Sequence, residues 1–204
     1  MRPGRGRRGT RAAPVARFEA LLEEVRACRA CVDLPLGPRP VFQLAPTARL
    51  LIAGQAPGTK VHASGLPFND PSGERLRAWM GVSRAEFYDA ERIAILPMAL
   101  CYPGRAKSGG DAPPPPECAR RWRARLLAQL PAIRLTLLIG MYAQNWALGP
   151  GNMSERVRDF RSYLPGCLPL PHPSWRSTLW IRERPWFETQ VLPALRAAVR
   201  EALA

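Results

Sequence analysis

Lysine and long apolar segments are the two things this chain most clearly lacks. Lys60 and Lys107 are its only lysines, and neither lies in a motif, so we expect neither Schiff-base chemistry nor a Walker-type phosphate loop. No run of roughly eighteen uncharged apolar residues occurs, which argues against a membrane-spanning helix. The basic segment 1–11 also lacks the apolar centre of a secretory signal, and a solvated tail is the expected alternative.

Acidic residues are scarce relative to basic ones. Sixteen Asp and Glu face thirty Lys and Arg, which gives a net charge of +14. Such an excess favours a polyanionic partner, because binding releases the counterions held by a phosphate backbone. A GC-rich genome explains arginine in place of lysine but not the shortage of acids. We therefore expect a nucleic-acid partner and no membrane. We also expect a monomer, located in the bacterial cytoplasm and associated with the nucleoid.

Short apolar runs alternate with amphipathic segments along most of the chain. We expect a disordered basic arm over residues 1–16 and one α/β domain over residues 17–204. The expected strands are residues 49–53, 92–96, 135–139 and 168–170, and the expected helices are residues 18–28, 72–80, 117–130, 142–147 and 186–203. This alternation is typical of a parallel sheet covered on both faces.

Two polar motifs follow apolar runs near opposite ends of the domain. Gly54-Gln55-Ala56-Pro57-Gly58 follows the first expected strand, and His172-Pro173-Ser174 follows the last. Ligands of open parallel sheets bind at the carboxyl ends of the strands, so the two loops are expected to form one site. Glycine lets the backbone approach a ligand closely, and proline holds a loop in one shape.

Four of the five cysteines fall into two separated pairs. Cys28 and Cys31 form a C-x2-C pair, while Cys101 and Cys118 lie at the edges of a loop rich in glycine and proline. Four thiolates from two segments suit a tetrahedral zinc ion or an iron–sulfur cluster. Free thiols in the core, with a C-x2-C pair by chance, fit the spacing equally well. Cys167 stands apart and is expected to be a buried hydrophobic residue.

In combination these motifs resemble the uracil-DNA glycosylase superfamily, and most closely its iron–sulfur branch, family four. Where this chain has residues 54–58, that branch has Gly-Glu-(Ala/Gly)-Pro-Gly. Its Gly-x-Pro-Phe motif corresponds to residues 65–68 of this chain, and its His-Pro-(Ser/Ala) motif to residues 172–174. Its four cluster cysteines match the order and approximate spacing of the four cysteines above. The likeness covers roughly residues 18–203, and the order of the motifs is more specific than any one of them.

The resemblance implies a three-layer α/β/α sandwich around a four-stranded parallel sheet. It also implies a monofunctional enzyme that flips uracil out of DNA and hydrolyses its N-glycosidic bond. His172 would donate a hydrogen bond to uracil O2 as negative charge develops on the leaving base, and Phe68 would stack on the base. The four cysteines would hold a 4Fe–4S cluster, in preference to zinc, at a distance from the chemistry.

The chain departs from the family pattern at three positions. Gln55 replaces the first-motif Glu, and Ala56 stands where the best-known branch has a water-activating Asp, although family four also lacks an acid there. Pro97 occupies the place of an Asn that reads the uracil edge, so Gln55 or Asn69 is expected to read it instead. Asp70 would orient the attacking water or stabilise a cationic sugar, or would only cap the next helix.

The remaining roles are implied by position in the motifs. The expected catalytic residues are His172 and Asp70, the substrate-binding residues Gln55, Ala56, Phe68, Asn69 and Ser174, and the DNA-binding residues Gly54, Pro57, Gly58, His62, Trp175 and Arg176. Trp175 or Arg176 would fill the gap left by the flipped nucleotide, although Trp175 could equally be a core residue. For His62, the alternative to DNA binding is an ordinary surface position. A non-cleaving relative that binds DNA or a modified base, or a glycosylase for another deaminated base, is the alternative function.

Overall fold

A computed structural model of the protein describes residues 12–107 and 109–204. Helix α1 (Ala12–Arg26) begins inside the segment expected to be a disordered arm, so residues 12–16 of that segment are helical. The rest of the expected arm lies outside the described residues. Among the helices of the described chain, none is long and apolar enough to cross a bilayer.

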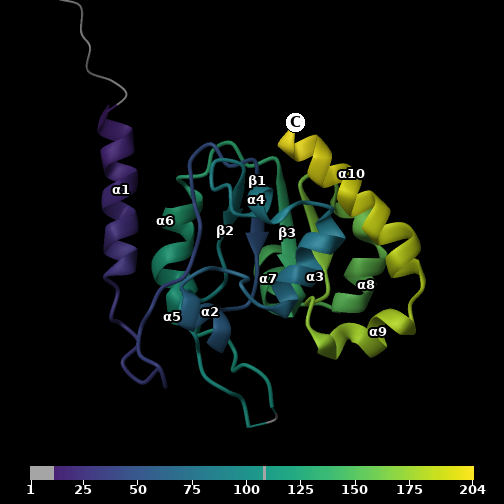
Figure 1. The fold of residues 1–204 in the computed structure, drawn as a ribbon, viewed down its shortest axis with the longest axis horizontal. Coiled ribbons are helices and arrows are strands. Elements are labelled where there is room, and N and C mark those ends of the chain that lie inside the picture. The colour runs from purple at the N-terminus through teal and green to yellow at the C-terminus, as the bar shows by residue number, and fades with distance from the viewer. Residues whose placement is uncertain (1–11, 108) are drawn as a thin grey trace, which may run out of the picture.

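Four short parallel strands form the sheet, in the spatial order β2-β1-β3-β4. Figure 1 shows β1 between β2 and β3. The strands are β1 (Leu50–Ala53), β2 (Ile93–Ile95), β3 (Leu135–Ile139) and β4 (Cys167–Leu170). Each lies within one residue of the strand expected from the sequence. The α/β class with a three-layer α/β/α sandwich and a four-stranded parallel sheet is confirmed.

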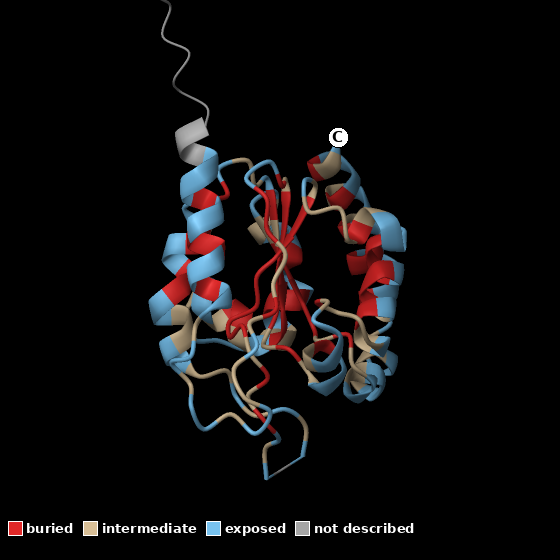
Figure 2. Ribbon diagram, turned by 60° about the vertical axis from the view of Figure 1, so that its left-hand side comes forward, coloured by how far each residue is buried: buried red, intermediate tan, exposed pale blue. Residues whose placement is uncertain are grey.

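The strands are buried on both faces because each face carries its own helical layer. Leu50 and Ile52 point to one side, where α3 (Pro71–Met80) and α10 (Leu192–Leu203) complete the core. Leu51 points to the other side, toward α1 and α6 (Ala124–Leu127). Figure 2 shows the buried strands between these two partly buried layers. Continuous apolar strands, rather than alternating ones, follow from burial on both faces.

The connections contain several short elements that the sequence pattern did not reveal. They are α2 (Thr59–Ser64), α4 (Arg84–Phe87), α8 (Met153–Arg158), α9 (Thr178–Arg182) and the 3-10 turns Phe160–Tyr163 and Trp175–Ser177. The helix expected over residues 117–130 consists of α5 (Pro116–Cys118), a π-helical turn (Ala119–Arg123) and α6. A second π-helical turn, Phe187–Val191, leads into α10.

A buried glutamine joins the carboxyl ends of two strands. Gln144 lies in α7 (Gly140–Leu148) and is fully buried. Its amide nitrogen donates to the carbonyl oxygens of Leu138 in β3 (3.4 Å) and Leu170 in β4 (3.0 Å). A buried amide needs such partners because its desolvation is otherwise uncompensated. The contact fixes the end of β4, from which the His172 loop departs.

Candidate active site

A cavity of about 600 Å³ opens at the carboxyl edge of the sheet. Loops after β1, β2 and β4 line it, together with the start of α3, so the two polar motifs meet as the sequence predicted. Its volume falls within the range of about 300–1,000 Å³ that is typical of small-molecule pockets. At this edge the chain continues from β1 to β2 on one side and later to β3 on the other side of β1. Open α/β sheets bind ligands where the connections diverge in this way.

The backbone at Phe68 is held in an unusual conformation. Phe68 has φ +53°, in the left-handed region that non-glycine residues rarely adopt. A Cβ at Gly73 would overlap the Phe68 carbonyl oxygen, so only glycine lets α3 approach the loop this closely. The Tyr88 hydroxyl donates to the Pro67 carbonyl oxygen at 3.0 Å and fixes the loop from another side. Strained backbone that its surroundings impose is typical of ligand sites.

The Phe68 ring is thereby presented to the cavity. Its edge lies against the Gly54 backbone, where an added Cβ would come 3.4 Å from the ring. Behind it, the Phe87 ring packs in a T-shaped arrangement at 6.2 Å between centroids. The ring therefore has a fixed place on the cavity wall, where it can act as a stacking platform for a planar ligand.

Asp70 caps helix α3 and lines the same cavity. One carboxylate oxygen, Oδ1, accepts a hydrogen bond of 2.8 Å from the Gly73 amide, so the capping contact allowed by the sequence is present. Asp70 is therefore both a structural cap and a negative charge at the cavity wall.

His172 enters the cavity from the loop after β4. The Ser177 hydroxyl donates to its carbonyl oxygen at 2.6 Å, and Gly140 packs beside its Cβ. Burial lowers the pKa of His172, and the negative charge of Asp70 opposes this only in part. The imidazole is therefore neutral at pH 7 and can donate one N–H to a group in the cavity.

The loop after His172 forms an exposed rim. Trp175 is 75% exposed, which rules out the core position considered for it. Arg75 donates to the Ser174 carbonyl oxygen at 2.9 Å, and Arg176 donates to the Gly109 carbonyl oxygen at 3.0 Å. These bonds tie the rim to α3 and to the loop between β2 and α5, so the indole projects from a well-braced support.

Most of the predicted site residues line this cavity. Those found there are Gly54, Gln55, Ala56, Pro57, Gly58, Phe68, Asp70, His172, Ser174, Trp175 and Arg176. Two are not among its lining residues. The side-chain oxygen of Asn69 accepts from Arg84 at 3.1 Å, and His62 lies near the Tyr102 ring, with centroids 6.4 Å apart.

The side chains of Gln55 and Pro97 both line the cavity, and only Gln55 offers polar atoms. Gln55 donates through Nε2 to the Ala112 carbonyl oxygen at 2.9 Å, and within the described part of the chain its Oε1 and second N–H have no other partner. Pro97 lines the cavity without a side-chain donor or acceptor, as its sequence position implied. The buried Arg123 donates to the Pro97 carbonyl oxygen at 3.3 Å and holds this wall from behind.

Two charged residues of the cavity were missed by the sequence reasoning. Arg105 and Asp111 reach it from the loop between β2 and α5, which glycine and proline dominate. An isolated antiparallel bridge pairs these two residues and gives the loop a defined shape. For Asp111, the only signal in the sequence is its position as a single acidic residue between Gly110 and a run of prolines. The periodicity of strands and helices does not single out such a position.

The four paired cysteines line a second cavity of about 370 Å³. It lies between the end of α1 and the start of α5, and none of its lining residues is shared with the first cavity. Burial raises the pKa of Cys101 to about 11 and also raises the pKa of Cys118 and of Cys31. Within the described residues, no three His, Cys, Asp or Glu side chains are grouped closely enough to hold a single metal ion.

Comparison with known proteins identifies the family of this chain. The model of the uracil DNA glycosylase superfamily matches residues 41–196. A solution structure from Methanosarcina acetivorans, provisionally named a uracil DNA glycosylase, is similar with a TM-score of 0.45 and 16% identity. That match covers 78% of this chain and 98% of the other. Family membership rests on the first of these findings.

Replacing Gly73 by alanine should release the Phe68 loop. The new Cβ would overlap the Phe68 carbonyl oxygen, so we expect the free energy of unfolding to fall by about 1–3 kcal/mol. Urea denaturation measures this loss. Gly166→Ala is the matched control, since its Cβ would meet nothing closer than 3.9 Å. Equal stability of the two variants would contradict the packing described for this loop.

Proposed function

The chain belongs to the uracil DNA glycosylase superfamily, and we propose that it is a monofunctional glycosylase that removes uracil from DNA. Membership itself supports a DNA glycosylase; the choice of uracil is our proposal. The observation that carries it is the joint position of Phe68 and a neutral His172 in one cavity, below an exposed Trp175. One chain forms the whole cavity wall around these side chains, and we propose that the protein acts as a monomer.

Base excision requires the target nucleotide to leave the helical stack. Phe68 offers the flipped base a flat apolar surface that replaces part of the lost stacking. Trp175 projects from the rim, where it can enter the gap left in the duplex, and the Arg176 guanidinium lies 5.5 Å from the centroid of its ring. The net charge of +14 supports tight contact with the DNA backbone.

Cleavage of the N-glycosidic bond leaves negative charge on the departing base. A hydrogen bond from His172 to uracil O2 would stabilise this charge, which exists only as the bond breaks. A neutral imidazole serves this purpose, because it donates a proton-bearing nitrogen without adding a full charge to a buried site. Asp70 would add negative charge to the cavity wall, which offsets part of the positive charge that develops on the sugar.

Reading of the base would fall to Gln55. Its free carbonyl oxygen and second N–H offer an acceptor and a donor, as the edge of uracil requires. The neighbouring Pro97 supplies no side-chain contact, so fewer polar groups discriminate between bases. The lack of a polar side chain at Pro97 is the observation that supports a second candidate function beside uracil excision. This candidate is a glycosylase for another deaminated base, such as hypoxanthine, which would use the same stacking and leaving-group contacts.

The cavity also supports hydrolysis without a lyase step. Lys60 and Lys107, the two lysines of the chain, are both exposed and absent from the cavity lining of the described structure. A Schiff base with the sugar needs an amine within reach of the reacting carbon. Water is therefore the proposed nucleophile.

We further propose that Cys28, Cys31, Cys101 and Cys118 hold a 4Fe–4S cluster. Four thiols around one cavity fit the ligand set of such a cluster, and a space of about 370 Å³ suits it better than a single zinc ion. Partial burial raises the pKa of Cys31, Cys101 and Cys118, so a bound metal would be needed to stabilise their thiolates. The cluster would join α1 to the loop before α5 and take no part in bond cleavage.

Excision of uracil from a labelled duplex oligonucleotide tests the function. We expect abasic product from the wild type and a rate about 10²–10³-fold lower for His172→Ala, the cost of losing a charge-stabilising donor. Gln190→Ala is the control, because it changes an exposed, uncharged residue outside the cavity lining. No product from the wild type, with the DNA still bound, would favour a different base or a non-cleaving protein.

The rate of excision should stay level as the pH falls through 6.5. Burial lowers the pKa of His172 below the ordinary value of 6.5, so the neutral donor persists as the pH falls through 6.5. We expect a level single-turnover rate through this pH and a decline only below it. A rate that declines at or above pH 6.5 would show that the imidazole is not held neutral by burial.

Iron content and visible absorption test the cluster. The wild type purified without air should contain about four irons per chain. Cys31→Ser should lose iron and thermal stability, whereas Cys167→Ser, outside the cavity lining, should retain both. A colourless, iron-free wild type with a fully cooperative unfolding transition would contradict the proposal.

A further inference from the structure

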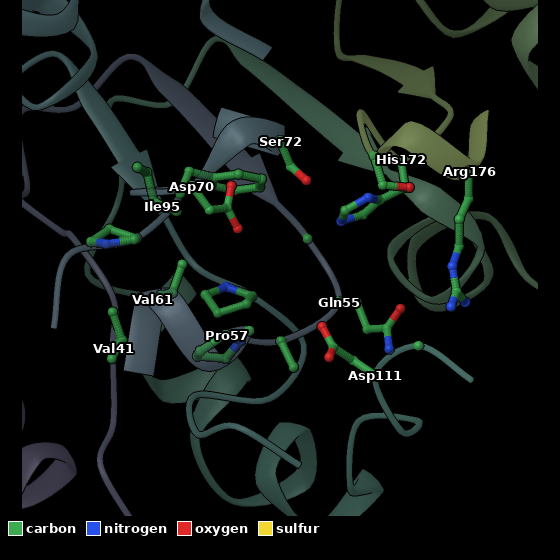
Figure 3. Close-up of a pocket in the computed structure, with 18 of the residues that line it drawn as sticks. Val41, Gln55, Pro57, Val61, Asp70, Ser72, Ile95, Asp111, His172 and Arg176 are labelled. Atoms are coloured by element: carbon green, nitrogen blue, oxygen red, sulfur yellow. The ribbon is translucent and has the colours of Figure 1, made fainter. Parts of the chain in front are cut away.

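Asp111 places a second carboxylate at the mouth of the cavity. It comes from the loop between β2 and α5, outside all the motifs of the sequence, and lies beside Gln55 with its carboxylate turned toward the cavity (Figure 3). Asp111 is an exposed residue, in contrast to the buried Ile95 and Pro97 on the inner wall. A base that enters this cavity leads with its ring, so the sugar to which it is attached stays near the mouth.

The loop holds this carboxylate in a defined place. Gln55 anchors the following residue through its bond to the Ala112 carbonyl oxygen, and Arg176 anchors the preceding turn at Gly109. Asp111 Oδ2 lies close to the Gly58 backbone, 3.4 Å from where a Cβ would stand. The carboxylate therefore packs against the first motif, and any side chain at position 58 would crowd it.

The two carboxylates of the cavity, Asp70 and Asp111, differ in the hydrogen bonds that they accept. Asp70 uses one oxygen to cap α3, whereas no side-chain or backbone donor bonds to the Asp111 carboxylate within the described residues. Although the residue as a whole is exposed, partial desolvation of its carboxyl group and the nearby charge of Asp70 raise the pKa of Asp111, while Arg105 and Arg176 oppose this. A carboxylate with free oxygens and an increased affinity for protons is suited to accept one.

We propose that Asp111 is the carboxylate that faces the sugar and takes a proton from the attacking water. This inference rests on the proposed function and names the proton acceptor of the same site. The bond between the sugar C1′ and the base nitrogen breaks, and its electron pair leaves with the base. Water oxygen then bonds to C1′, one water proton passes to Asp111, and solvent later removes that proton as the base gains one. The negative charge of Asp111 also stabilises the cationic sugar before water attacks.

Binding of a cationic sugar mimic tests this assignment without requiring catalysis. The probes are two otherwise identical duplexes, one with a positively charged pyrrolidine at the target site and one with neutral tetrahydrofuran. The wild type should bind the cationic duplex more tightly. Asp111→Asn should reduce that preference by about three- to tenfold, since it removes a charge near the sugar. Asp159→Asn, an exposed residue outside the cavity lining, is the control and should leave the preference unchanged.

Asp70→Asn separates the two carboxylates, because asparagine also caps helices well. Loss of the preference in this variant alone would assign the sugar-facing role to Asp70 and overturn the proposal. An unchanged preference in Asp111→Asn, or equally weakened binding of both duplexes, would overturn it as well.

Single-turnover excision of uracil completes the test. Asp111→Asn should lower the rate by about 10²-fold, the typical cost of losing a general base. A wild-type rate in the variant would overturn the proposal. If the wild type releases no uracil while its preference for the cationic sugar depends on Asp111, the choice of uracil fails and the assignment of Asp111 stands.

Discussion

Parallel pairing of β1 with both β2 and β3 brings distant parts of the chain to one edge of the sheet. Strands that run in the same direction end on the same side, so the loops that follow them meet there. The Gly54–Gly58 loop and the His172 loop are more than a hundred residues apart, yet they line a single cavity. Gln144 reinforces this arrangement by bonding to the carbonyl oxygens at the ends of β3 and β4.

Rigid placement of the stacking ring and the histidine is the second requirement for the proposed chemistry. Phe68 keeps a left-handed backbone because Gly73 admits its carbonyl oxygen and Asp70 starts the helix beside it. His172 keeps its position through Ser177 and its neutral form through burial. A site prepared in this way has little to reorganise as charge develops on the base, which is the main source of electrostatic catalysis.

The sequence predicted the sheet and the motif loops because both depend on local patterns. Short apolar runs mark strands that are buried on both faces, and glycine with proline marks the loops that follow them. Asp111 was missed because its place at the cavity depends on bonds that Gln55 and Arg176 make to the neighbouring residues Ala112 and Gly109, which no spacing encodes. Asn69 was expected in the cavity from its place beside Phe68, but Arg84 holds its side-chain oxygen.

A crystal structure with DNA that carries an uncleavable 2′-fluoro uridine tests the account most directly. We expect the uracil stacked on Phe68, with O2 within about 3 Å of an imidazole nitrogen of His172 and the Trp175 indole in the vacated stack. The sugar would lie at the mouth of the cavity. A uracil that stays paired within the duplex, or that lies outside this cavity, would contradict the account.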